Sequence, residues 1–325
     1  MAATLFLGVL VPQIRTFGDE HAQDPKAVPA GLIQLGTGSY YSPYAIVVDK
    51  KARTLTLWKQ SDKTLEKVVE FPSDIGKQAG NKSKLNDHRT PEGIYFTLKM
   101  IEGPGLNFDL YGKRAYTLDY PNLFDQREGK TGSGIWLHAI PENQTLARGS
   151  RGCVVVRNES ILALGKYISP ERTPVLIYES VPYQSAEEKL VKDKEIETWL
   201  AKWIDAWKKK DIESYIGFYS PTFHSMKMNR EKWKIYKDAL NKKYEKIDIN
   251  LYSPIIFEHN NGYVVRGLQA YHSDGLEDFG EKTIYIQKET DGLKIIGEQW
   301  DAVDNPGVAR GLARCCLAES AASKN

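Results

Sequence analysis

Two residues with the chemistry for covalent catalysis lie fifteen positions apart near the middle of the chain. His138 ends one apolar run, and Cys153 begins another after a short polar turn. A neighbouring imidazole can accept the thiol proton or stabilise the thiolate, which is the nucleophilic form of cysteine. Two antiparallel strands joined by a loop of this length would bring the two side chains together. The pair is therefore a candidate for nucleophilic catalysis.

The turn before Cys153 reads Ser150-Arg151-Gly152, and its residue types suit a nucleophile. Gly152 frees the backbone to bend, and we expect its N–H and that of Cys153 to point at a developing oxyanion. Arg151 places a positive charge beside the thiol, which should lower the thiol pKa or bind a substrate carboxylate. The alternative is that Cys153 is a small buried hydrophobe, as a cysteine that heads an apolar run most often is.

Strand patterns surround this pair, and helical patterns are scarce. One short helix is expected near residues 160–167. Runs of β-branched and aromatic residues between polar turns predict strands at 44–49, 54–58, 67–71, 94–98, 135–138, 153–156 and 174–178. These patterns predict a mainly-β domain over residues 42–181. The Gly-, Pro-, Asp- and Ser-rich residues 17–42 are expected to form an irregular lead-in.

The pattern changes near Pro182, where a second domain is predicted. Apolar residues at helical spacing form one stripe along residues 184–210, and two shorter helices are expected after it, at 211–219 and 230–243. Four alternating runs with hairpin turns then follow, between residues 247 and 296. Helices followed by a strand meander predict an α+β domain over residues 184–302. The remaining residues, 303–325, are expected to be a loose tail that carries Cys315 and Cys316.

Composition and the N-terminal run restrict the class of protein. The 325 residues carry 44 Lys and Arg against 42 Asp and Glu, so no nucleic-acid-binding surface is expected. The six histidines show no zinc-motif spacing and no phosphate-binding glycine motif is present, so neither metal nor cofactor is expected.

The apolar run at residues 2–11 is too short to span a membrane and has the size of an export-signal core. We therefore expect an exported, periplasmic protein with residues 1–41 as export signal and lead-in and no transmembrane anchor after signal removal. The alternative is that the apolar run is a frayed terminal segment.

The residues around the Cys/His pair resemble the L,D-transpeptidase (YkuD) catalytic domain over about residues 42–180. The matching motifs are Trp136-Leu137-His138, Ser150-Arg151-Gly152-Cys153-Val154 and the upstream runs Tyr120-Pro121-Asn122-x-Phe124-Asp125 and 129–135. The resemblance implies that Cys153 is the nucleophile, that His138 is its base, and that Ser150 and Gly152 shape the oxyanion loop. It also implies a peptidoglycan stem peptide as substrate, attacked at the third-position diaminopimelate with loss of the terminal D-alanine.

Three positions depart from that family pattern. Ala139 stands where glycine usually follows the histidine, and Arg151 stands where a second histidine is common. Val155 occupies the position where crosslinking members usually carry arginine. The last departure removes a fixed cation from the site and puts ordinary crosslinking in doubt.

The second domain resembles an NTF2-like domain, a fold that encloses a conical pocket. Candidates to line that pocket are Tyr252, Arg266, Tyr271 and Trp300, although aromatic residues of this kind are also typical of a core. The resemblance implies binding or targeting here, and by analogy a homodimer. The order of the two domains is similar to that of the LD-carboxypeptidases that set cell shape in curved and helical bacteria, among them a curvature-determining enzyme of a predatory bacterium.

These features together predict a mainly-β YkuD-type catalytic domain followed by an α+β NTF2-like domain, in a cysteine-dependent LD-carboxypeptidase that trims tetrapeptide stems to tripeptides. Two alternatives share the chemistry: an L,D-transpeptidase that forms 3-3 crosslinks, and an amidase that releases diaminopimelate-linked protein. A third alternative is a non-catalytic scaffold that binds the wall through its NTF2-like domain.

Overall fold

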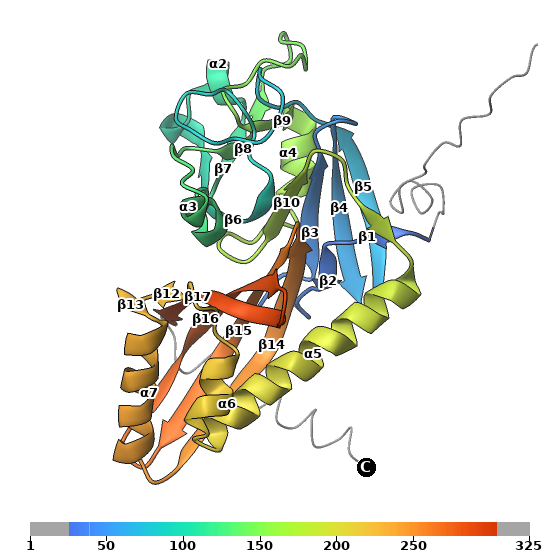
Figure 1. The fold of residues 1–325 in the computed structure, drawn as a ribbon. Coiled ribbons are helices and arrows are strands. Elements are labelled where there is room, and N and C mark those ends of the chain that lie inside the picture. Colours follow the sequence, from blue (N-terminus) through green and yellow to red (C-terminus); the bar gives the residue numbers. More distant parts are fainter. Residues whose placement is uncertain (1–25, 39, 304–325) are drawn as a thin grey trace, which may run out of the picture.

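The computed structural model describes residues 26–38 and 40–303 (Figure 1). The predicted export signal, and Cys315 and Cys316 in the predicted tail, lie outside these ranges. Within them, an eight-stranded and a five-stranded sheet dominate, accompanied by two two-stranded sheets. The predicted fold class, a mainly-β domain followed by an α+β domain, is confirmed.

The eight-stranded sheet builds the N-terminal domain. Its strands are β3 (Tyr44–Asp49), β4 (Thr54–Ser61), β5 (Thr64–Pro72), β6 (Gly93–Glu102), β7 (Arg114–Leu118), β8 (Trp136–Ile140), β9 (Val154–Arg157) and β10 (Pro174–Tyr178). They follow the order β5-β4-β3-β10-β6-β7-β8-β9. The short helices are η1 (Gly103–Gly105), α2 (Phe108–Tyr111), α3 (Leu123–Arg127) and α4 (Asn158–Leu164). A core of fully buried residues such as Val48, Leu137 and Val154 holds this sheet together.

The five-stranded sheet and three helices build the C-terminal domain. Its long strands are β14 (Ile247–His259), β15 (Gly262–Ser273), β16 (Glu277–Glu289) and β17 (Gly292–Ala302), and its helices are α5 (Ala186–Lys208), α6 (Ile212–Gly217) and α7 (Arg230–Lys243). Between α6 and α7 lies a small hairpin of β12 (His224–Ser225) and β13 (Met228–Asn229). Ser185 and Glu188 form a capping box that fixes the start of α5. The predicted apolar stripe of α5 is core, because Trp203 and Trp207 are buried against the sheet.

The predicted irregular lead-in is wrong for residues 28–34. β1 (Val28–Pro29) pairs with β11 (Tyr183–Gln184), and β2 (Leu32–Gln34) joins the C-terminal sheet beside β14. Leu32 and Ile33 are fully buried, each in a different hydrophobic cluster. A strand this short gains its stability from tertiary burial rather than from its local composition, so the Gly- and Pro-rich sequence concealed it.

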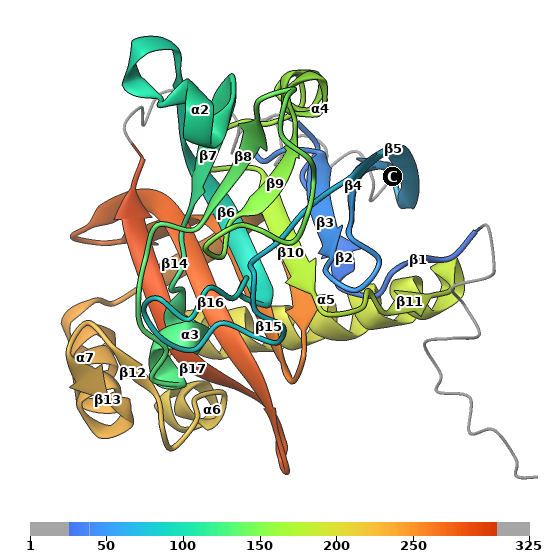
Figure 2. The ribbon, with the colours of Figure 1, turned by 90° about the horizontal axis from the view of Figure 1, so that it is seen from above.

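The two domains share a hydrophobic core, so they pack as one body. The C-terminal sheet lies between its own helices and the N-terminal domain (Figure 1). Phe96 packs edge-on against Phe257 across the interface, with ring centroids 6.0 Å apart. On the same face, α3 lies over β16 and β17 (Figure 2), where Phe124 packs edge-on against Tyr285. The expected homodimer stays a prediction, and it must use a surface other than this covered sheet face.

Candidate active site

Cys153 and His138 line one cavity of about 500 Å³ at the edge of the eight-stranded sheet. Ser150 and Arg151 border it too, and α2 and the loop at residues 82–86 contribute to its other walls. His138 is buried and Cys153 is half-buried. The cavity therefore combines a nucleophile and a base that are reachable by a small substrate.

The strands that carry the pair run parallel, and the sequence-based expectation of antiparallel strands is wrong. β8 pairs with β9 with Leu137 opposite Val154 and His138 opposite Val155. A parallel pair requires a crossover that returns the chain to the same end of the sheet, and residues 141–153 supply it. Residues two apart on a strand face the same side, so Cys153 follows the side of Val155, beside His138.

The turn before Cys153 is held by its own hydrogen bonds. Ser150 Oγ donates to the Cys153 carbonyl at 2.7 Å and accepts the Gly152 N–H at 3.1 Å. Gly152 has a φ of +126°, and a Cβ there would lie 2.6 Å from the carbonyl oxygen of Arg89, so glycine is required. Because Ser150 already accepts the Gly152 N–H, the expected pair of oxyanion donors is not free as predicted; Ser150 and Gly152 do shape the loop.

Burial keeps both members of the pair neutral. It raises the pKa of the Cys153 thiol to about 11. A hydrogen bond from the Trp136 backbone and the positive charge of Lys82 lower this pKa, but by less. Burial also lowers the pKa of His138, and a hydrogen bond to the backbone of Ala139 opposes this. Arg151, which was predicted to lower the thiol pKa, is not among the causes, because its side chain is exposed and solvent screens its charge.

The tautomer of His138 follows from its hydrogen bond. Nδ1 lies 2.7 Å from the carbonyl oxygen of Ala139, and a carbonyl only accepts, so Nδ1 carries the proton. In the neutral ring Nε2 is then the basic nitrogen. Tyr111 of α2 packs edge-on against the imidazole at 5.1 Å and fixes its plane. The thiol itself lies 3.7 Å from the carbonyl oxygen of Gly134, its acceptor in the protonated state.

A buried carboxylate that the sequence did not single out anchors the crossover. Asp74 accepts the Gly149 N–H at 3.2 Å and pairs with Arg53 at 3.0 Å. The same guanidinium donates to the carbonyl of Leu146 at 2.8 Å, and the backbone of Asp74 exchanges two hydrogen bonds with Val155. These contacts fix both ends of the segment that presents Cys153.

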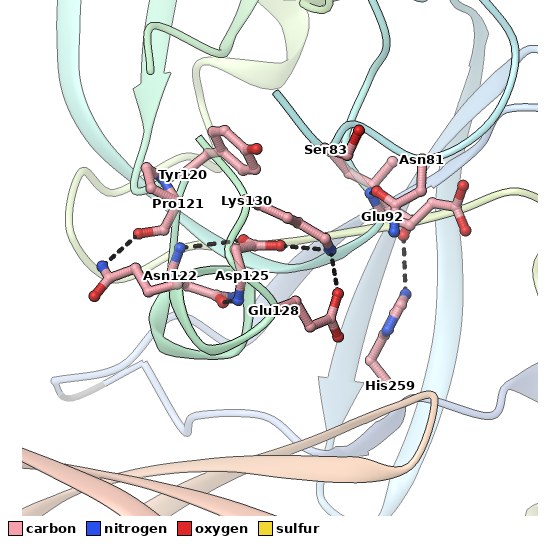
Figure 3. Close-up of polar contacts among 12 residues, drawn as sticks. Asn81, Ser83, Glu92, Tyr120, Pro121, Asn122, Asp125, Glu128, Lys130 and His259 are labelled. Carbon is pink, nitrogen blue, oxygen red and sulfur yellow. Dashed lines mark hydrogen bonds and ion pairs between the residues drawn. The ribbon is translucent and has the colours of Figure 1, made fainter. Parts of the chain in front are cut away.

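The Tyr-Pro-Asn motif builds the support for the strand of His138. Asn122 and Asp125 form a capping box at the start of α3. Asp125 then pairs with Lys130 at 2.9 Å, and Lys130 also pairs with Glu128 (Figure 3). Tyr95 donates its hydroxyl to Asp125 at 3.1 Å. Lys130 begins the segment that leads through Gly134 to β8, so this buried ion pair positions one wall of the catalytic cavity.

The four residues predicted to line an NTF2-like pocket do not converge. Tyr252 and Arg266 lie on the sheet face that meets the catalytic domain, where the Arg266 guanidinium covers the Phe96 ring at 3.6 Å and donates to the Glu171 carbonyl. Tyr271 is buried in the core on the helix side, and Trp300 is partly exposed near the sheet edge. A register shift in β14 after Tyr252 changes which side its residues face, which a sequence pattern does not reveal.

The helix side of that sheet instead holds a buried charged cluster. Lys237 of α7 places its ammonium 3.7 Å from the centroid of the Trp207 ring and 4.7 Å from that of Trp233. Burial lowers the pKa of Lys237 to about 7. Glu298 accepts hydrogen bonds from Tyr219 and from Lys282. In residues 26–38 and 40–303 no group of three His, Cys, Asp or Glu side chains is placed to hold a metal ion.

The comparisons with known proteins follow the division into two domains. Residues 43–177 match the L,D-transpeptidase catalytic domain (YkuD), and residues 195–299 match the Cds6 C-terminal NTF2-like domain. No curated protein matches the sequence.

Two solved structures resemble the chain along most of its length. Bd1075 from Bdellovibrio bacteriovorus is 44% identical with a TM-score of 0.79, and the match covers 86% of this chain and 99% of that one. The helical cell shape determining protein Pgp2 from Campylobacter jejuni is 25% identical with a TM-score of 0.65, covering 83% of this chain and 96% of that one. Both proteins therefore match across the two domains and not over the catalytic domain alone.

Proposed function

Because this chain belongs to the family that joins a YkuD-type L,D-transpeptidase catalytic domain to a C-terminal NTF2-like domain, we propose that it is a cysteine-dependent LD-carboxypeptidase. The family's catalytic domain acts on peptidoglycan, so the chain is a wall-modifying enzyme. The finer proposal is that it hydrolyses the bond between diaminopimelate and the terminal D-alanine of a tetrapeptide stem. It leaves a tripeptide.

The observation that supports the proposal is that Cys153 and His138 line the same cavity. On substrate binding, Nε2 of His138 takes the thiol proton, and Sγ attacks the carbonyl carbon of the scissile amide. The imidazolium then gives that proton to the departing nitrogen, D-alanine leaves, and a thioester remains. A water molecule, deprotonated by the same imidazole, attacks the thioester and releases the tripeptide and the free thiol.

The position of Val155 favours water as the acceptor. Val155 is 4% exposed and carries no charge at the position where crosslinking members of the family usually have arginine. The exposed side chains of Leu85 and Leu110 also line the cavity, and they suit the aliphatic part of a diaminopimelate side chain. The second candidate function, transpeptidation, is kept because the matching domain is a transpeptidase domain.

We place the enzyme in the periplasm and connect it with cell shape. Among residues 26–38 and 40–303, no helix is long and apolar enough to cross a membrane. Pgp2 is described as a helical cell shape determining protein, and its similarity to this chain extends over both domains. We infer that the NTF2-like domain contributes recognition or targeting, since the Cys/His pair lies in the other domain.

A digest of purified muropeptides tests the reaction. The wild-type protein should convert tetrapeptides to tripeptides with release of D-alanine, and Cys153→Ala should abolish this conversion while leaving the circular dichroism spectrum unchanged. Persistence of tetrapeptides with the appearance of 3-3 dimers would favour the transpeptidase, and release of a linked protein would favour the amidase. Unchanged muropeptides, with wall binding that Cys153→Ala retains, would favour a scaffold.

A further inference from the structure

Two basic side chains line the catalytic cavity, and only one of them lacks a partner among residues 26–38 and 40–303. Lys82 is buried, and its ammonium donates to Asp87 at 2.7 Å and to the Lys84 carbonyl at 3.1 Å. Arg151 is exposed, and its guanidinium makes no hydrogen bond or ion pair with the described residues. Arg151 is thus the uncommitted cation of the cavity.

The acidic groups nearby do not cancel this charge. Asp74 also borders the cavity, but its carboxylate is taken by Arg53 and by the Gly149 N–H. Asp109 of α2 also borders the cavity, and it forms no ion pair with Arg151. Arg151, which lines the cavity two residues before the nucleophile, therefore carries an unneutralised guanidinium on a turn that the hydrogen bonds of Ser150 hold.

We propose that Arg151 binds the terminal carboxylate of the departing D-alanine and so restricts the enzyme to the end of a stem peptide. The inference rests on the proposed function. In a substrate of this kind the free carboxylate lies three bonds from the scissile carbonyl carbon, on the leaving side. A guanidinium matches a carboxylate with two parallel hydrogen bonds, which a lysine does not reproduce. An internal peptide bond has no carboxylate at that place and leaves the guanidinium unpaired.

A pair of matched substrates tests the assignment. The first is the tetrapeptide with its terminal D-alanine as the free acid, and the second is the same peptide with a terminal amide. Arg151→Gln should lower kcat/KM for the acid by about tenfold to a hundredfold, the range of a charge-assisted hydrogen bond, and lower it far less for the amide. Arg151→Lys should restore part of the preference. D-alanine and its amide differ as leaving groups. Because this difference is the same for every variant, comparing the ratio of kcat/KM for the acid to kcat/KM for the amide between variants removes it.

Arg148 supplies the control, because it is an exposed arginine of the same crossover that does not border the cavity. Arg148→Gln should leave the acid-to-amide ratio of the wild type unchanged. An equal loss on both substrates in Arg151→Gln would overturn the assignment and make Arg151 a residue that only shapes the turn. A wild-type protein that releases no D-alanine from the acid would instead overturn the proposed function itself.

Discussion

At the scale of single residues, Cys153 and His138 form a neutral pair rather than a preformed ion pair. Burial raises the pKa of the thiol to about 11 and lowers that of the imidazole, so at neutral pH the proton stays on sulfur. The nucleophile is then generated only when substrate fills the cavity and His138 accepts the proton. A resting thiol of this kind is also a poor target for oxidants, which react with the thiolate.

The pH dependence of two reactions follows from these directions. A base works only when deprotonated, and the pKa of His138 lies below its ordinary value of 6.5, so we expect the midpoint of the acid limb of kcat/KM to lie below pH 6.5. Alkylation of Cys153 by iodoacetamide in the free enzyme should keep increasing up to about pH 11. Both are measured in a Cys315→Ser/Cys316→Ser background, which leaves Cys153 as the one thiol of the three cysteines. An alkylation rate already constant at pH 8 would contradict the neutral pair.

At the scale of elements, the approach of β8 and β9 depends on polar contacts outside the sheet. The Asp125–Lys130 pair holds the segment before β8, and Asp74 with Arg53 holds the crossover before β9. The carboxylates of Asp125 and Asp74 are buried, whereas Glu128 in the first cluster and Arg53 in the second are partly exposed to solvent. Ion pairs outside the sheet thus position the Cys/His pair.

Asp125→Asn tests the first of these clamps. The Lys130 side chain is 9% exposed, and among the residues that the structure describes the change leaves it the exposed Glu128 as its one ionic partner. Removing one member of a buried pair should lower the free energy of unfolding by about 3 kcal/mol, measured by urea denaturation. Glu128→Gln is the matched control and should cost less than about 1 kcal/mol, because that carboxylate is exposed. Equal effects of the two variants would show that the Asp125 pair is not a structural clamp.

At the scale of the whole molecule, the two domains are joined by more than a linker. β2 precedes the catalytic domain in the chain but lies in the C-terminal sheet, and a shared core fills the interface. The sheet face of the NTF2-like domain is therefore part of the interior. We expect the two domains to unfold together, since separating them exposes apolar residues from both.

Phe257→Ala tests this coupling. Phe257 is fully buried against Phe96, so its truncation should cost about 3–5 kcal/mol. Calorimetry should show one transition in the wild type, shifted to lower temperature in the variant, and the fluorescence of tryptophans in both domains should follow it. A second transition that the substitution leaves in place would mean that the catalytic domain is stable by itself. Leu190→Ala, at an exposed position of α5, is the control and should change the melting temperature little.

The class of fold and most strands follow from local sequence patterns, and the same patterns predict the Cys/His pair. Continuous apolar runs such as 44–49 and 174–178 coincide with β3 and β10, because a short apolar run between turns is typical of a strand buried on both faces. The motifs around His138 and Cys153 lie within one stretch of the chain, so the family resemblance was visible without any knowledge of pairing.

Other features depend on contacts between residues that are far apart in the chain, and no local pattern predicts them. The parallel pairing of β8 with β9, the strand at Leu32–Gln34 and the faces on which Tyr252 and Arg266 lie all follow from partners far along the chain. The pKa of Cys153 belongs here too, because burial by distant parts of the chain raises it, against smaller effects of the Trp136 backbone and Lys82, and the neighbouring Arg151 has no part in the shift. A local sequence pattern indicates that a residue is buried, but it does not indicate which distant residues pack against it.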